Sequence, residues 1–171
     1  MSNRKKALVT GASTGIGRPV AVSLAEAGFD VAVTPRDLEP LDSLAATVAL
    51  IERVGTHALE LELDLVDPVS VGVAAATLLE RWDGVDVIAH SARHLGPGHN
   101  ETLMGGSIEH IAKHMQGNFF TPLQLNRALI PAMAARGGGV ILNLDSVAAF
   151  GDPKRSADDG GWGLSYGASK A

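Results

Sequence analysis

The chain of 171 residues contains no cysteine and few aromatic residues, with a single tyrosine among them. Without cysteine it can form neither a disulfide framework nor a thiolate metal site. No apolar run in it approaches the roughly 20 residues that a membrane-spanning helix needs. The formal net charge of -5 argues against a surface for nucleic acid or for an anionic membrane.

Hydrophobic residues make up 46% of the chain, which is enough for a packed core. The basic segment 4–6 leads into a short apolar run and a glycine-rich loop, without a signal-peptide cleavage pattern. No repeat, low-complexity tract or linker divides 1–171, so we expect a single domain. These features favour a cytoplasmic globular protein that binds neither nucleic acid nor membranes.

Short apolar runs alternate with helical patterns along the chain. The apolar runs predict strands over 6–10, 30–34, 56–63, 85–89 and 140–144. Capping residues and glycine stops predict helices over 15–27, 38–54, 68–82 and 107–136, the last interrupted or kinked near Pro122 and Pro131, and a final helix from Ser165. Repeated strand–helix units imply a doubly wound parallel α/β sheet with helices on both faces.

A glycine-rich loop, Thr10–Gly17, joins the first predicted strand to the first predicted helix. Gly11 allows a sharp turn, Gly15 lets the backbone approach a pyrophosphate, and Gly17 lets the helix pack closely on the strand. The amides and the positive dipole end of the helix then meet the phosphates. An ordinary glycine-rich turn is the alternative, but the flanking strand and helix favour a dinucleotide site.

The spacing Thr-Gly-x-x-x-Gly-x-Gly resembles that of the short-chain dehydrogenase/reductase family. Four further motifs follow in the family's order, at Asp64, Asn118, Ser146 and the pair Tyr166 and Lys170. The resemblance covers nearly the whole chain. It implies a Rossmann-type, three-layer α/β/α fold and an NAD(P)-dependent oxidoreductase that acts on a small-molecule alcohol or ketone. It also implies assembly as a homodimer or homotetramer.

The resemblance assigns a catalytic role to four of these side chains. Tyr166 and Lys170 are four residues apart, so they share one face of a helix. An unperturbed tyrosine has a pKa of about 10, and a nearby ammonium stabilises the phenolate and lowers that value. Tyr166 is then the general acid/base, and Lys170 also binds the nicotinamide ribose. Ser146 hydrogen-bonds the substrate oxygen, and Asn118 holds a water next to Lys170.

The cofactor contacts implied by the resemblance come from the glycine loop and from the ends of several strands. They are Gly11, Ser13, Thr14, Gly15, Ile16, Gly17, Arg36, Asp64, Leu65, His90, Ser91, Ala92, Tyr166 and Lys170.

The end of the second strand favours NADP(H) over NAD(H). The NAD-preferring branch of the family carries an aspartate where this chain has Pro35, and Arg36 suits a 2'-phosphate. Asp37 could pair with Arg36 or face the ribose itself.

The chain departs from the family's pattern in three places. The usual Asn-Asn-Ala-Gly is His90-Ser91-Ala92-Arg93, so an arginine replaces the glycine of the usual tight turn. Asp145 either shapes the substrate pocket electrostatically or points away from it. The segment between Ser146 and Tyr166 is longer and more polar than usual, and we expect 152–162 to form an excursion at the rim of the pocket. Its Trp162 either covers the substrate or packs beneath the loop.

Family members continue past the lysine with further strands, so we expect the chain to be a fragment or to lack a C-terminal part. A cofactor-binding or sensor domain without catalysis is the alternative function. An epimerase or dehydratase of the same fold ranks last, because its usual glycine spacing differs. His110 and His114 have a metal-binding spacing on a helix, but no complete ligand set accompanies them, so we expect no metal site.

Overall fold

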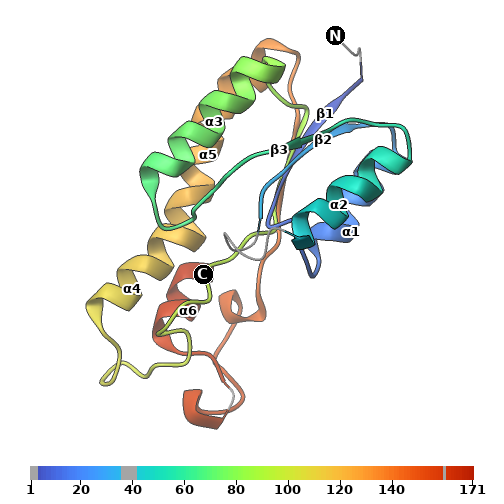
Figure 1. Cartoon of the computed structure of the whole chain (residues 1–171). Coiled ribbons are helices and arrows are strands. Elements are labelled where there is room, and N and C mark those ends of the chain that lie inside the picture. Colours follow the sequence, from blue (N-terminus) through green and yellow to red (C-terminus); the bar gives the residue numbers. More distant parts are fainter. Residues whose placement is uncertain (1–3, 36–41, 160) are drawn as a thin grey trace.

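The centre of the molecule is a parallel sheet of five strands in the order β3-β2-β1-β4-β5 (Figure 1). The computed structural model describes residues 4–35, 42–159 and 161–171. The strands are β1 (Lys6–Thr10), β2 (Asp30–Val33), β3 (Ala58–Glu60), β4 (Val87–His90) and β5 (Val140–Asn143). Because β1 pairs with both β2 and β4, the strand order reverses direction at β1, and ligands of open α/β sheets bind beyond such a point.

Helices cover both faces of the sheet, which confirms the expected three-layer Rossmann-type fold. One layer contains α1 (Gly17–Glu26) and α2 (Asp42–Arg53), and the other contains α3 (Pro68–Trp82) and α5 (Thr121–Ala135). Two further helices, α4 (Ile108–Met115) and α6 (Leu164–Lys170), pack together at the lower end of the molecule in Figure 1. The short 3-10 turns η2 (Val147–Ala149) and η3 (Ala157–Asp159) precede α6.

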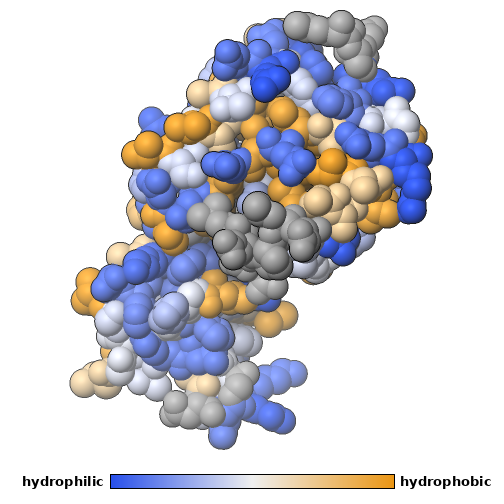
Figure 2. All heavy atoms as spheres, viewed as in Figure 1, coloured by the Kyte–Doolittle hydropathy of each residue, from blue (hydrophilic) through white to orange (hydrophobic). Residues whose placement is uncertain are grey.

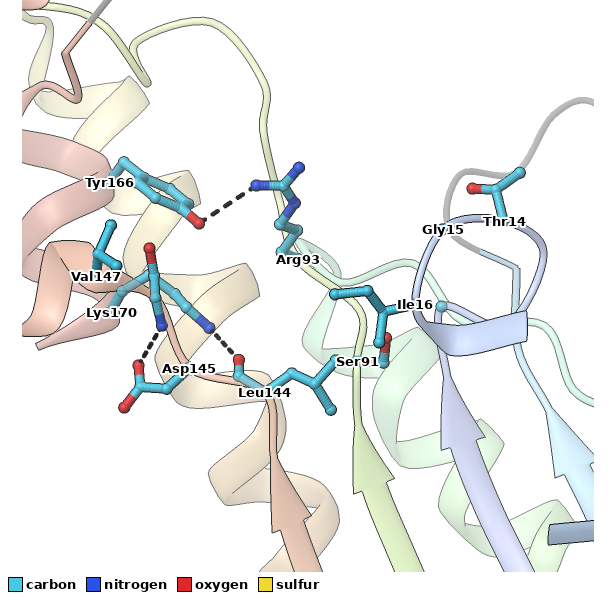
Figure 3. Close-up of a pocket in the computed structure, with 12 residues that line it drawn as sticks. Thr14, Gly15, Ile16, Ser91, Arg93, Leu144, Asp145, Val147, Tyr166 and Lys170 are labelled. Carbon is cyan, nitrogen blue, oxygen red and sulfur yellow. Dashed lines mark hydrogen bonds between the residues drawn. The ribbon is translucent and has the colours of Figure 1, made fainter. Parts of the chain in front are cut away.

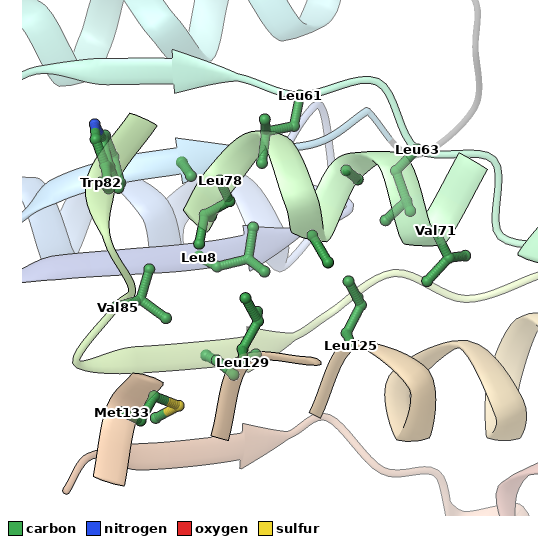
Figure 4. Close-up of a cluster of buried hydrophobic side chains, with 14 of the residues drawn as sticks. Leu8, Leu61, Leu63, Val71, Leu78, Trp82, Val85, Leu125, Leu129 and Met133 are labelled. Atoms are coloured by element: carbon green, nitrogen blue, oxygen red, sulfur yellow. The ribbon is translucent and has the colours of Figure 1, made fainter. Parts of the chain in front are cut away.

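Each helical layer has its own hydrophobic core against the sheet. Successive side chains of β1 point to opposite faces, so Leu8 joins the core under α3 and α5 while Ala7 and Val9 join the core under α1 and α2. Figure 4 shows the first core, in which Leu78 of α3 and Leu129 of α5 meet over the sheet. Burial on both faces explains the mostly apolar sequences of the three central strands, β2, β1 and β4, whereas β3 and β5 at the edges are partly exposed.

Polar residues gather away from these cores. In the view of Figure 2, hydrophobic side chains reach the surface over the upper part of the molecule, whereas hydrophilic ones prevail over the lower part with α4 and α6. In the ranges that the structure describes, no helix is both long and apolar enough to cross a membrane.

Helix α3 shows how local signals set the boundaries of an element. The Asp67 carboxylate accepts a hydrogen bond of 2.9 Å from the amide of Val69, and Pro68 occupies the first turn, where no intrahelical amide is lost. The helix ends at Trp82 because Asp83 adopts a left-handed conformation, with φ of 57°. These bounds are those predicted from the sequence.

The long predicted helix over 107–136 is divided in the structure. Ser107 caps α4, and the π-helical turn η1 (Gln116–Phe120) separates α4 from α5, directly before Pro122. A π turn rotates the residues that follow it relative to those before it, and such turns are common at functional sites. The predicted interruption near Pro122 is therefore confirmed, whereas α5 continues through Pro131.

Truncating the core between α5 and the sheet should destabilise the fold far more than the same change on the outside of α5. Leu129 is fully buried, while Leu123 on the same helix is 43% exposed. We expect Leu129→Ala to lower the free energy of unfolding by about 2–5 kcal/mol, and Leu123→Ala by about 1 kcal/mol or less. Chemical denaturation of both variants measures the difference, and equal losses would contradict this view of the core.

Candidate active site

A cavity of about 430 Å³ opens beyond the carboxyl ends of β1, β4 and β5 (Figure 3). It lies at the reversal of strand order, where the sequence places the glycine loop. Its walls combine that loop, the segment after β4, the segment after β5, and α6. The lining residues are Gly11, Thr14, Gly15, Ile16, Ser91, Arg93, Leu144, Asp145, Ser146, Val147, Tyr166 and Lys170.

At Gly11 the backbone of the glycine loop lies very close to the segment after β4. Its φ is +68°, and its amide donates a hydrogen bond of 3.1 Å to the hydroxyl of Thr34. A Cβ on Gly11 would lie 2.7 Å from the Cα of Ala92, which no side chain tolerates. Glycine is therefore needed here both for the turn and for contact with the segment after β4.

The other two glycines of the loop have different roles. A Cβ on Gly17 would collide with the carbonyl oxygen of Gly11 and would lie 2.8 Å from the Gly11 carbonyl carbon, so Gly17 lets α1 begin directly against the loop. Gly15 has a φ of +57° and faces open space. The turn at Gly11 and the close packing at Gly17 are as expected from the sequence, and the approach of a pyrophosphate to Gly15 stays a prediction.

The start of α1 offers unsatisfied polar groups. Among the described residues, the buried hydroxyl oxygen of Thr14 has no hydrogen-bond partner, and no side chain caps α1 at Ile16. The first amides of an α-helix have no partner within the helix itself. Unsatisfied donors at a helix N-terminus, beside an open Gly15, suit the phosphates of a dinucleotide.

A hydrogen-bond network that could not be predicted from the sequence holds the glycine loop against α2. The Arg18 guanidinium donates to the hydroxyl of Thr47 at 3.0 Å, to the carbonyl of Ser43 at 2.7 Å and to the carbonyl of Ser13. The buried Thr47 hydroxyl in turn donates to the carbonyl of Ala12 at 2.9 Å. No sequence motif indicates that Arg18 and Thr47 are in contact, because the contact depends on how α1 and α2 pack side by side.

The segment after β4 is held to β1 by Thr10, whose hydroxyl accepts hydrogen bonds from the amides of Ser91 at 3.2 Å and Ala92 at 3.1 Å. Ser91 lines the cavity. Within the described residues, Asp83 is the one non-glycine residue with a positive φ. Arg93 therefore fits this turn without the backbone conformation that would call for glycine.

His90 lies outside this cavity and is almost fully buried, with 5% of its surface exposed. Its Nε2 forms a hydrogen bond of 2.8 Å with the side-chain oxygen of Asn126. Burial lowers the pKa of His90 below its ordinary value; the bond to Asn126 opposes this shift, and the charge of Lys170 adds to it. His90 lines a second cavity, of about 250 Å³, which it shares with Ala92, Asn118 and Lys170.

The other predicted cofactor residues lie apart from the first cavity. The Asp64 carboxylate accepts a hydrogen bond from the amide of Val66 at 2.9 Å, and the carbonyl of Leu65 accepts one from the hydroxyl of Thr121 at 2.7 Å. In this structure both residues organise the turn before α3, and their contact with an adenine stays a prediction. Arg36 and Asp37 fall outside the described residues.

The predicted catalytic residues converge from distant parts of the chain. Tyr166, buried in α6, directs its hydroxyl into the cavity. Ser146 caps η2 with its side-chain oxygen, which accepts from the amide of Ala148 at 3.2 Å. The ammonium of Lys170 donates to the carbonyl of Leu144 at 2.8 Å. Three of the four therefore share one cavity.

Asn118 is the exception, since it does not line this cavity. Its side-chain oxygen accepts a 2.6 Å bond from the amide of His94, and its side-chain nitrogen donates to the carbonyl of His94 at 3.2 Å and to the hydroxyl of Ser169 at 3.0 Å. Asn118 thus ties η1 to the segment after β4 and to α6. It borders the second cavity behind Lys170, and the expected water there stays a prediction.

The phenol of Tyr166 has contacts that change its acidity. Burial raises its pKa, but hydrogen bonds from Ser146 and Arg93 and the charges of Arg93 and Lys170 outweigh this, so the pKa lies below its ordinary value. The contact with Arg93 joins Nη1 to the Tyr166 oxygen at 3.4 Å. The site therefore favours the phenolate that a general base requires.

The structure places Asp145 and Trp162, whose roles could not be decided from the sequence. Asp145 lines the cavity, and its carboxylate accepts a hydrogen bond of 2.8 Å from the amide of Ser146 (Figure 3). Trp162 packs on α6, where a Cβ on Gly167 would lie 3.3 Å from its ring. It also lines a third cavity, of about 450 Å³, that shares Val147 with the first. Both functions considered for Trp162 are thus compatible with its position.

The paired histidines of α4 have structural contacts. His110 forms an ion pair of 3.0 Å with Glu101, and Nδ1 of His114 lies 2.9 Å from the carbonyl oxygen of His110. Over the ranges 4–35, 42–159 and 161–171, no group of three or more His, Cys, Asp or Glu residues is arranged to hold a metal ion.

The contact between Gly17 and Gly11 leads to a test of the loop. We expect Gly17→Ala to lower the affinity for nicotinamide cofactor at least tenfold and to reduce stability, because the new methyl group must push the loop away from α1. Gly72→Ala, on the exposed face of α3, is the control and should slightly raise stability through helix propensity. Fluorescence titration with cofactor measures the affinity, and an unchanged affinity in Gly17→Ala would contradict this role.

Comparison with known proteins agrees with this geometry. The family model of short chain dehydrogenases matches residues 5–171. A mouse (Mus musculus) protein, dehydrogenase/reductase SDR family member 7B, is 32% identical over 141 residues, covering 82% of this chain and 43% of its own length. A short chain dehydrogenase of Penicillium thymicola is 30% identical over 174 residues, covering 98% of this chain and 58% of its own. The chain spans about half the length of these curated relatives.

Solved structures resemble this chain in the same way. L-Sorbose reductase from Gluconobacter frateurii, complexed with NADPH and L-sorbose, has a TM-score of 0.82 and 27% identity, over 98% of this chain and 59% of that one. A metagenomic short-chain oxidoreductase in complex with NADP has a TM-score of 0.81 and 29% identity, over 97% and 70%. With the cavity, the glycine loop and the ordered motifs, these matches show that the chain belongs to the short-chain dehydrogenase family.

Proposed function

We propose that this chain is the cofactor-binding and catalytic part of an NADP(H)-dependent oxidoreductase that transfers a hydride between nicotinamide and an alcohol or carbonyl substrate. One observation carries the proposal: the glycine loop, Ser146, Tyr166 and Lys170 surround a single cavity although they are far apart in sequence. A cofactor-binding turn alone would not need the other three residues.

The cofactor half of the site fits a pyrophosphate. The uncapped start of α1, the partnerless hydroxyl of Thr14 and the open side of Gly15 are the donors and the space that phosphates require. The same segment would orient the nicotinamide toward Tyr166. When bound, the cofactor supplies or accepts the hydride, and the protein handles the proton.

The phenol oxygen of Tyr166 is the group that donates and accepts the proton. During reduction, Tyr166 gives its proton to the carbonyl oxygen that becomes the alcohol; during oxidation, it takes that proton back. Ser146 is positioned to hydrogen-bond the same substrate oxygen as charge develops on it. Lys170 borders both the first and the second cavity, so it links the phenol to the polar space near Asn118.

The preference for NADP(H) rests on Arg36 and on the absence of an acidic residue at Pro35. Similar solved structures carry NADPH or NADP, which supports the same choice here. The cofactor phosphate would then meet a guanidinium close to the end of β2.

The substrate is a small alcohol or ketone that reaches Tyr166 from the side of η2. The third cavity supports this direction, because Val147 lines both it and the cavity of Tyr166. Exposed apolar side chains on η1 and α5 support assembly into a homodimer or homotetramer; they are Phe119, Phe120, Leu123 and Ile130.

Replacing the proposed acid/base separates catalysis from cofactor binding. We expect Tyr166→Phe to reduce turnover at least about 100-fold, and to leave the cofactor dissociation constant within about threefold. Absorbance of the reduced nicotinamide, with a panel of ketones and alcohols, measures turnover in the natural full-length protein. Near-normal turnover in Tyr166→Phe would remove Tyr166 from this role. Cofactor binding without turnover in the unaltered protein would favour the sensor domain instead.

The cofactor preference has a separate test. Arg36→Ala should weaken NADPH binding roughly tenfold, because it removes a charge-assisted hydrogen bond to the 2'-phosphate, and should leave NADH binding nearly unchanged. Arg53→Ala, which removes the same charge from the last turn of α2, is the control and should affect neither. Equal losses for NADPH and NADH in Arg36→Ala would overturn the preference.

A further inference from the structure

Arg93 lies between the glycine loop and Tyr166 in the first cavity (Figure 3). Its side chain comes from the segment after β4, on the opposite wall from α6. The Nη1 nitrogen donates to the phenol oxygen of Tyr166 at 3.4 Å. The family's usual pattern has glycine at this position, so the guanidinium is a departure from that pattern.

Lys170 has a different geometry. Its ammonium donates to the carbonyl of Leu144 at 2.8 Å and acts on the phenol of Tyr166 through its charge. In the described part of the chain, the cationic nitrogen that forms a hydrogen bond with the phenol oxygen belongs to Arg93. A direct donor stabilises a phenolate more strongly than a charge of the same sign at longer range.

We propose that Arg93 is a catalytic residue of this site, because its guanidinium donates directly to the phenol oxygen of Tyr166 and stabilises the phenolate. This inference rests on the proposed function for the role of Tyr166 and names a residue that the family pattern lacks. After Tyr166 has given its proton to the carbonyl oxygen, Arg93 holds the negative charge that remains on the phenol. During oxidation Arg93 stabilises the phenolate, which is the form of Tyr166 that accepts the proton.

The charged groups around the phenol support this role. Arg93 faces it from the segment after β4, Lys170 from α6, and Asp145 lines the same cavity from the segment after β5. Burial raises the pKa of Tyr166, Ser146 and Arg93 lower it by hydrogen bonds, and the charge of Arg93 lowers it more than that of Lys170 does. The Asp145 carboxylate is bound by the amide of Ser146. An arginine stays protonated throughout the useful pH range, so its effect is constant.

The acidity of Tyr166 can be measured without cofactor or substrate. Tyr166 is the single tyrosine of these 171 residues, and the ultraviolet absorbance of a phenolate reports its ionisation in the natural full-length protein. Subtracting the signal of Tyr166→Phe removes any other contribution. We expect Arg93→Gly to raise the pKa by about one unit, which lowers the phenolate fraction roughly tenfold at a given pH.

Two matched variants complete the titration. Arg93→Lys keeps a cation at this position and should raise the pKa less than Arg93→Gly does. Arg53→Ala removes an equal charge from α2 and should leave the pKa unchanged. The proposal is overturned if Arg93→Gly shifts the pKa no more than Arg53→Ala does.

A second readout uses the full-length enzyme in the direction of alcohol oxidation, which requires the phenolate. The acid limb of its pH–rate profile should move to higher pH in Arg93→Gly and return part of the way in Arg93→Lys. An unmoved limb in Arg93→Gly contradicts the role of Arg93. This outcome is distinct from a failure of the proposed function. Near-normal turnover in Tyr166→Phe would contradict the proposed function, but it would not change the effect of Arg93 on the titration of Tyr166.

Discussion

The contact on which the rest of this structure depends is the close approach of three backbone segments at the reversal of strand order. Gly11, Gly17 and Ala92 come so near that a single Cβ on either glycine would overlap its neighbour's backbone. This approach joins the start of α1 to the segments after β1 and β4. Among the described residues no side chain caps α1 at this point, which suits a helix N-terminus that binds an anion.

The groups proposed to be catalytic are arranged around this contact. Thr10 binds the amides of Ser91 and Ala92. Arg93, the next residue, therefore extends from a well-supported backbone toward Tyr166. Asn118 fastens the following residue, His94, to α6 through Ser169. The glycine loop, the segment after β4 and the Tyr166 helix are thus connected by hydrogen bonds.

Sequence reasoning predicted the features that depend on local chemistry. The alternation of strands and helices, the capped start of α3 at Asp67, the turn at Gly11 and the close packing at Gly17 follow from residue type and spacing. The network of Arg18 with Thr47 could not be predicted, because these residues meet only when α1 and α2 pack together. The buried position of His90 beside Asn126 depends likewise on the packing of β4 against α5.

The sequence by itself determined that a glycine-rich loop, a serine and a Tyr-x-x-x-Lys pair occur in the family's order, since each of these motifs consists of neighbouring residues. Only the tertiary structure decided which cation contacts Tyr166 and which groups share its cavity. The arginine at position 93 is 73 residues from Tyr166 in the chain, and no local pattern relates two residues so far apart. Their meeting is set by the parallel sheet, which brings the carboxyl ends of β1, β4 and β5 to one edge.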